Sequence, residues 1–234
     1  MVIVGDVEAT QALAQVQHYF GKIAARPTPS RNDVTEFEPL GYRHLEISEH
    51  VQTANLSMAW NVQSISTAPQ AEDAYALNIL RSVLDSGISS RLQAKLVREQ
   101  KLLTVANVSY DPYNRGDSLF SISAIPAQGV TLQQAQEAIQ AEIDLLQKQP
   151  VDARELKRVA DKFMANLVYN QDDISAQAKM IGNLAVNGLS YRVMDDAAQY
   201  LKQVKPADIQ RVAQQYLKRD RLSTMYLSPQ PAQK

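Results

Sequence analysis

The stretch that decides the fold is Gly87-Ile-Ser-Ser-Arg-Leu-Gln-Ala-Lys-Leu-Val-Arg-Glu-Gln-Lys-Leu-Leu103. Its first part is rich in leucine, alanine, glutamine, lysine and arginine, which favour helices. Gly87 separates it from an earlier helical pattern over residues 70–85, and from Leu103 onward the chain changes to alternating strand-forming residues. The stretch therefore predicts a helix that leads directly into a β-strand.

The strands expected around this helix form two pairs. Residues 103–110 and 118–125 both alternate, and the turn-rich residues 111–116 between them predict a hairpin. Nearer the N-terminus, residues 42–48 and 52–64 also alternate and predict two strands paired with each other. In the second of these, one face carries apolar side chains: Leu56, Met58, Trp60 and Val62.

The chain after Thr131 is mostly helical by pattern, with a last strand expected over residues 222–227. Thr131 with Gln134, and Asp152 with Glu155, have the spacing of helix-capping boxes and so predict where two helices begin. Three more helices are expected, over residues 174–185, 192–202 and 207–217. This order of elements predicts an α+β domain in which helices cover one mostly antiparallel sheet.

Composition excludes several classes of function. The 234 residues can bury a sizeable core, and 45% hydrophobic with 21% charged residues is ordinary for a globular protein. A net charge of -1 gives no overall field to attract nucleic acid, and no stretch has the ~20 apolar residues of a membrane span. The absence of cysteine excludes disulfides and thiolate metal sites.

The first 41 residues have a different organisation from the rest. Met1 to Val4 predict a strand with no charged leader before it, so no signal peptide is expected. An amphipathic helix follows and ends at Gly21, and after it come three prolines with serine, asparagine and aspartate. The expected divisions are a strand and helix over residues 1–25, a linker over 26–41, a domain over 42–229 and a tail over 230–234.

The pattern of Ser90-Arg91-Leu92, then Leu96-Val97-Arg98-Glu99, then a strand resembles the peptide-handling helix and strand of the pitrilysin (insulinase-like) zinc metallopeptidases. Those enzymes are built from two similar halves, and usually only the first binds zinc. The resemblance implies that this chain is a C-terminal half without metal. It also implies that residues 1–25 are the tail of a preceding homologous domain.

Metal chemistry within this chain is not expected. Zinc catalysis uses about three protein ligands, most often imidazole and carboxylate, plus a water. Of the three histidines, His18 lies in the first predicted helix, while His44 and His50 lie in strand-like sequence. None forms the family's inverted His-x-x-Glu-His pattern, because residues 46–50 have glutamate in place of its first histidine. We therefore expect no catalytic residue and no cofactor here, and the family resemblance implies zinc in a partner half.

The predicted helix offers positive charge instead. Arg91, Lys95 and Arg98 would share one face of an α-helix, beside an apolar stripe that runs from Ile88 to Leu96. A basic stripe beside a buried one usually faces solvent, which is the interpretation for Arg91 and Lys95. Arg98 falls where family members have an arginine that holds the substrate backbone, so the resemblance implies substrate binding. Glu99 is interpreted as part of helix structure.

The sequence departs from the family pattern in the strand that follows. The family pairs its arginine with a tyrosine seven residues further on, but this position is Val105, and the glycine expected before it is Thr104. Tyr110 has the opposite parity and should project from the other face of the sheet. Asn107 and Ser109 share the Val105 face and could supply weaker hydrogen bonds, although a polar strand face is the simpler interpretation.

Three functions remain open at this stage. The first is the metal-free half of a zinc endopeptidase, which would enclose an extended peptide substrate against a zinc-bearing half. The second is an inactive peptidase-like scaffold, which Val105 favours. The third is a peptide-binding module that acts alone. The family resemblance also implies export, with a periplasmic location in bacteria.

Overall fold

The computed structural model describes residues 1–27 and 41–230, and its centre is one five-stranded sheet. The strand order is β1-β5-β2-β4-β3, and every neighbouring pair is antiparallel except β1 with β5, which is parallel. The α+β prediction with a mostly antiparallel sheet is confirmed. The strands are β1 (Arg43–Glu49), β2 (Asn55–Val62), β3 (Leu103–Ser109), β4 (Ser118–Pro126) and β5 (Leu222–Pro229).

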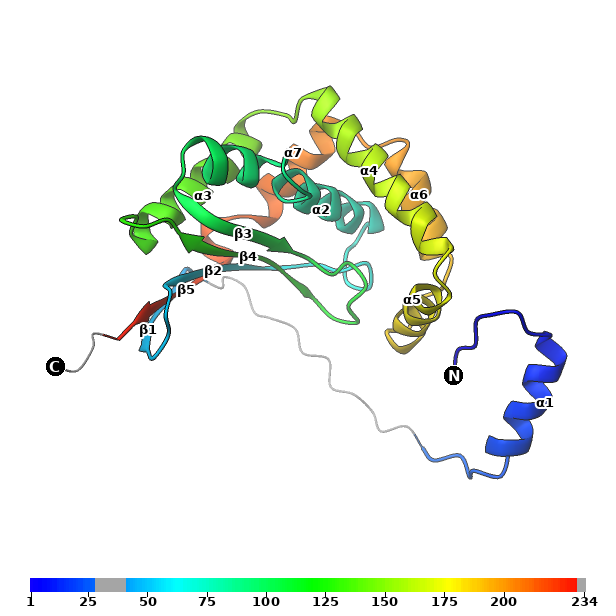
Figure 1. Cartoon of the computed structure of the whole chain (residues 1–234). Coiled ribbons are helices and arrows are strands. Elements are labelled where there is room, and N and C mark those ends of the chain that lie inside the picture. Colours follow the sequence, from blue (N-terminus) through cyan, green and yellow to red (C-terminus); the bar gives the residue numbers. More distant parts are fainter. Residues whose placement is uncertain (28–40, 231–234) are drawn as a thin grey trace.

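Helices cover one face of this sheet and continue beyond one end of it (Figure 1). Helices α2, α3 and α7 lie against the sheet, while α4, α5 and α6 extend away from it. The helices are α1 (Ala9–Phe20), α2 (Ala71–Leu84), α3 (Leu132–Lys148), α4 (Ala153–Gln171), α5 (Ile174–Val186), α6 (Val193–Leu201) and α7 (Pro206–Tyr216). A π-helix, η1 (Leu92–Glu99), precedes β3, and a short 3-10 turn, η2 (Arg219–Arg221), precedes β5.

The core lies between the sheet and these helices, and strand alternation decides which side chains enter it. All four apolar residues of the predicted face of β2 are buried, and Trp60 meets Phe120 of β4 edge to face. The opposite face of the sheet has small residues that are only half-buried, among them Ser57, Ala59 and Ser121. The sheet thus has one packed face and one open face.

The helices and the hairpin, which depend on residues close together in the sequence, form where they were predicted. Strands β3 and β4 form the expected hairpin. The α3 capping box is present, because the Thr131 hydroxyl accepts from the Gln134 backbone N–H at 3.1 Å while the Gln134 side chain accepts from the Thr131 N–H at 2.9 Å. At α4, Asp152 accepts from the N–H groups of Arg154 and Glu155, so the predicted start of the helix is confirmed. The capping box itself is only half formed, because the Glu155 carboxylate accepts from Arg91 instead of the Asp152 N–H. The predicted helical ranges of the C-terminal half are confirmed as α5, α6 and α7.

The predicted pairing of the first two strands is wrong. Strand β5 lies between β1 and β2 and pairs with both of them. Strands that are neighbours in sequence pair with each other in most sheets, but β5 comes from the far end of the chain and takes that place. Strand β1 is left at the edge of the sheet, and almost all of its residues are exposed.

The predicted strand at Met1 to Val4 is also absent. These residues are irregular, because a strand needs a hydrogen-bonding neighbour and none of the five described strands lies beside them. Helix α1 forms as expected but buries none of its residues. The proposed linker at residues 26–41 lies almost wholly outside the described residues.

The helix at the centre of the sequence analysis is wound more widely than predicted. Residues 92–99 form a π-helix, in which the Gln100 N–H donates to the Lys95 carbonyl five residues earlier. The helix ends at Glu99, and two residues later Lys101 has a left-handed φ of 54° and turns the chain into β3. Ile88 precedes this helix and is 77% exposed, so it is not part of a buried stripe.

Neighbouring residues of β4 test the two faces of the sheet. Phe120→Ala removes a fully buried ring, and we expect it to lower the free energy of unfolding by about 3–5 kcal/mol. Leu119→Ala is the matched control, because Leu119 is 55% exposed on the open face and its loss should cost less than about 1 kcal/mol. Urea denaturation measures both, and equal losses would contradict the assignment of the faces.

Candidate functional site

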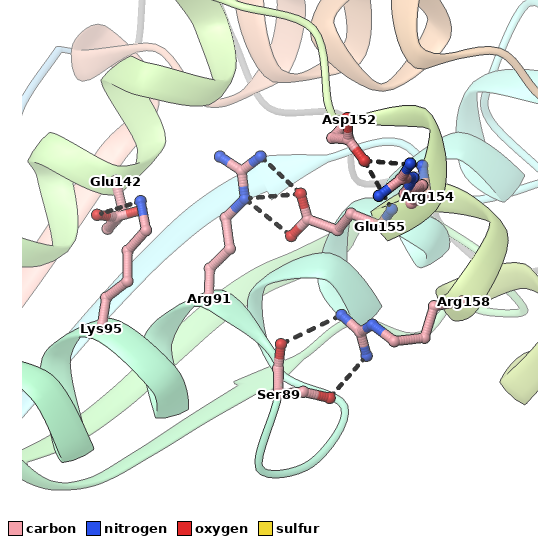
Figure 2. Close-up of polar contacts among 8 residues, drawn as sticks. All are labelled: Ser89, Arg91, Lys95, Glu142, Asp152, Arg154, Glu155 and Arg158. Carbon is pink, nitrogen blue, oxygen red and sulfur yellow. Dashed lines mark hydrogen bonds and ion pairs between the residues drawn. The ribbon is translucent and has the colours of Figure 1, made fainter.

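A bidentate ion pair ties the start of the π-helix to α4. The Arg91 guanidinium donates to both carboxylate oxygens of Glu155, with Nη2 at 2.8 Å from Oε2 and Nε at 3.0 Å from Oε1 (Figure 2). The two side chains are only 16% and 18% exposed. Such a planar, partly desolvated pair fixes direction as well as distance.

A second ion pair ties the middle of the same helix to α3. The Lys95 ammonium donates to both carboxylate oxygens of Glu142 at 3.1 and 2.9 Å (Figure 2). The Glu142 side chain is only 6% exposed, so Lys95 supplies its compensating charge. We call Arg91–Glu155 and Lys95–Glu142 together the charge clamp.

The loop before the π-helix is also bound to α4. The Arg158 guanidinium donates to the hydroxyl and the carbonyl of Ser89 at 2.9 and 3.2 Å (Figure 2). The Lys162 ammonium donates to the Ser86 carbonyl. The Ser90 hydroxyl donates to the Gly87 carbonyl at 2.6 Å. The entry into the helix is therefore fixed by several contacts.

The interpretation of Arg91 and Lys95 as a solvated face is wrong. Both are paired with acids that lie 64 and 47 residues away in sequence, which periodicity within one helix cannot identify. The sequence does contain a weak signal for one of these acids, Glu142. Glu142 lies among the apolar positions of α3, next to Ile143 and three residues after Ile139, where an acid needs a buried partner.

Side chains from around the π-helix also close the free edge of β3. The Gln93 amide nitrogen donates to the Ala106 carbonyl at 2.7 Å, and the Asp85 carboxylate accepts from the Val108 N–H at 3.1 Å. Ala106 and Val108 are two residues apart, so these groups lie along one edge of the strand. Sequence reasoning missed Gln93, because a glutamine outside the apolar stripe of a predicted helix gives no sign that it contacts a strand.

Arg98 differs from the other two basic residues of the helix. It is exposed, and within residues 1–27 and 41–230 no hydrogen bond or ion pair engages its side chain. The prediction that it shares a face with Arg91 and Lys95 assumed α-helical winding. A π-helix turns by roughly 80° per residue instead of roughly 100°, so positions seven apart lie on nearly opposite sides. Arg98 is therefore directed away from the charge clamp.

Core contacts agree with this winding. Leu92 and Leu96 are buried, and Val97 also packs against the core. In an α-helix Val97 would lie far around from Leu92, whereas five residues in a π-helix return to within roughly 40° of the starting direction.

Strand β3 presents the positions expected to complete the site. Val105 is half-buried and shares the open face with Asn107 and Ser109, both of which are exposed. The Ser109 hydroxyl lies 2.8 Å from that of Ser121. Tyr110 projects into the core as predicted and donates to the Gln63 carbonyl at 2.7 Å, and burial raises the pKa of its phenol. Tyr110 therefore cannot take the place of the family tyrosine, whose position is occupied by Val105.

The residues present do not fit a catalytic zinc ion. The His44 ring contacts the Thr224 hydroxyl at 2.8 Å and the Glu46 carboxylate at 3.0 Å, while His18 is on α1 and His50 follows β1. Within the described residues, no three His, Cys, Asp or Glu side chains come close enough to hold a metal ion. In the same part of the chain, no helix is long and apolar enough to cross a membrane.

A hollow of about 880 Å³ lies between β1 and helices α3 and α7. Several of its polar side chains are bonded to one another. The Gln133 amide donates to Glu137 at 2.9 Å, and the Gln140 amide donates to Asp144 at 2.8 Å. Because these groups already have partners, this hollow is a weaker candidate than the surface around Arg98.

Comparison with known proteins identifies the family to which this chain belongs. The profile of the family described as "Peptidase M16 inactive domain" matches residues 1–163, which is more than half of the chain. The chain belongs to this family of inactive M16 peptidase domains, and the resemblance to the pitrilysin-type zinc peptidases is confirmed.

Individual relatives show what the fold is similar to. The zinc protease PqqE of Helicobacter pylori is 28% identical over 158 residues, 68% of this chain and 35% of that protein. The structure of a protease from Helicobacter pylori has a TM-score of 0.88 at 23% identity, covering 97% of this chain and 54% of the other. A peptidase M16 inactive domain from Pseudomonas fluorescens has a TM-score of 0.79 at 16% identity, covering 98% and 53%. The chain thus spans about a third to a half of these relatives.

The Lys95–Glu142 pair is partly buried and the Lys157–Asp161 pair is exposed, so their contributions to stability can be compared. Lys95→Met leaves the Glu142 carboxylate buried without a partner, and we expect a loss of about 3 kcal/mol in the free energy of unfolding. Lys157→Met breaks the exposed Lys157–Asp161 pair and should cost less than about 0.5 kcal/mol.

The double variant Lys95→Met with Glu142→Leu should regain most of that stability, because both charges are then removed from the interface. Chemical denaturation at neutral pH measures all three proteins. If Lys95→Met costs no more than Lys157→Met, the charge clamp does not hold the helix.

Proposed function

We propose that this chain is the metal-free half of a zinc endopeptidase and that it encloses and positions an extended peptide against a zinc-bearing half. The observation that supports this proposal most directly is Arg98. Its neighbours Arg91 and Lys95 are used to hold the helix in place, while Arg98 is exposed and has no partner among the described residues. A basic side chain on a firmly anchored helix is suited to bind something outside the chain.

The chemistry of a guanidinium fits a peptide backbone. Its fixed donors can bind a carbonyl oxygen and stabilise negative charge that develops there during attack on the amide. Zinc in the partner half would supply the activated water. The residues of this half would contribute binding and orientation, in keeping with a family described as inactive.

The open face of the sheet supports the same proposal. Small and polar side chains there, including Ser57, Ala59 and Ser123, leave room for a polypeptide and impose little preference for its side chains. Helix α1 buries nothing within this chain, which supports residues 1–25 as the tail of a preceding half, joined through 26–41 to the domain at 42–229. The periplasmic protease PqqL of Escherichia coli has a TM-score of 0.71 and 18% identity, and favours export.

Reconstitution tests this function. The purified chain is combined with its zinc-bearing half, and cleavage of a fluorescence-quenched peptide is followed. We expect hydrolysis well above that of the zinc-bearing half alone, and Arg98→Ala should lower kcat/KM by about tenfold or more because a backbone donor is lost.

Arg192→Ala is the matched control, since Arg192 is an exposed arginine at the start of α6, far from the π-helix in sequence. It should leave hydrolysis unchanged. Equal activity with and without this chain would refute the proposed function.

One observation favours a second candidate, an inactive peptidase-like scaffold or peptide-binding domain. The tyrosine that accompanies the arginine in active relatives is Val105 here, which leaves Arg98 without its usual partner. An intact His-x-x-Glu-His motif in the partner half supports the protease, and a degenerate motif supports the scaffold.

A further inference from the structure

We propose that Gln93 is a second peptide-binding residue beside Arg98, and that the two bind the backbone of one peptide residue as an acceptor and a donor. The proposal rests on the proposed function, because it extends the site around Arg98. It assigns a role to a residue that neither the sequence pattern nor the family resemblance singled out.

Helical winding places the two side chains together. Gln93 and Arg98 are five residues apart, and in a π-helix this separation corresponds to one turn with an offset of roughly 40°. In an α-helix they would differ by roughly 140°. The contact of Gln93 with Ala106 identifies this side of the helix as the side facing the edge of β3. Arg98 therefore lies on the β3 side as well.

The orientation of the Gln93 amide is set by its partner. A backbone carbonyl accepts only, so the amide nitrogen must be the atom that contacts Ala106 at 2.7 Å. The Gln93 carbonyl oxygen is then held away from β3, and none of the described residues donates to it. This fixed orientation gives the site an acceptor next to the donors of Arg98.

Backbone geometry of an extended peptide matches this pair. The N–H and C=O of one residue in a strand point to the same side. A peptide along the β3 side can therefore donate its N–H to Gln93 and accept from Arg98 through its carbonyl. Direct strand addition at Ala106 and Val108 is blocked, because Gln93 and Asp85 already occupy those edge groups. Recognition by two side chains thus replaces recognition by the strand edge.

The pairing also accounts for binding without the family tyrosine. Val105 cannot form a hydrogen bond through its side chain, but Gln93 can supply one from the helix. Because both contacts are to the backbone, the pair binds peptides with little regard to sequence.

Two labelled probes separate the two contacts. Hexaglycine has both backbone groups, whereas hexasarcosine retains every carbonyl and has no amide N–H in its sarcosine–sarcosine bonds. Fluorescence anisotropy with the 234-residue chain measures both affinities. We expect the chain to prefer hexaglycine, and Gln93→Ala to reduce that preference by about 3–10-fold, the value of one hydrogen bond. Arg98→Ala should weaken both probes and leave their ratio unchanged.

Gln149→Ala is the matched control, because Gln149 is an exposed glutamine at the end of α3 and its loss should leave both affinities unchanged. If Gln93→Ala lowers the melting temperature but keeps the preference for hexaglycine, Gln93 only closes the edge of β3 and the inference is wrong. Failure of the unsubstituted chain to bind hexaglycine, or to prefer it, also overturns the inference and needs no variant. If Arg98→Ala leaves both affinities unchanged, Arg98 does not bind the peptide, and the role of Arg98 in the proposed function fails together with this inference.

Discussion

The charge clamp is the interaction on which the rest of this site depends. Arg91 with Glu155 and Lys95 with Glu142 hold one side of the π-helix against α4 and α3 (Figure 2). Gln93 holds the other side against β3. A helix fixed on both sides cannot rotate about its axis, so the side of the helix from which Arg98 projects is set before any ligand arrives. Such preorganisation lowers the entropic cost of binding.

The π-helical winding of residues 92–99 also determines where Arg98 lies. With α-helical geometry, Arg98 would lie beside Arg91, on the side that faces α3 and α4. The π-helix moves it to the side facing β3, and the packing of Val97 against the core supports that winding. The wide turn therefore separates two tasks among similar residues: Arg91 and Lys95 anchor the helix, and Arg98 is presented to the outside.

Local features of the fold were predictable from sequence, and distant contacts were not. The buried face of β2, the β3–β4 hairpin and the cap at Thr131 depend on residues close together in the chain. The position of β5 between β1 and β2 depends on residues more than 150 positions apart. Arg98 could be singled out by resemblance, but the partners of Arg91 and Lys95 come from other helices. The π-helix could not be foreseen either, because its residues are ordinary helix formers.

The most direct test of this account observes the arginine side chains themselves. In ¹H–¹⁵N NMR spectra of the chain, the Nε–Hε resonances of Arg91 and Arg98 are followed while hexaglycine is added. The account predicts that the Arg98 resonance shifts and that the Arg91 resonance does not, because Arg91 stays bonded to Glu155. An unchanged Arg98 resonance at concentrations where other signals shift, or a shift of Arg91 alone, would contradict it.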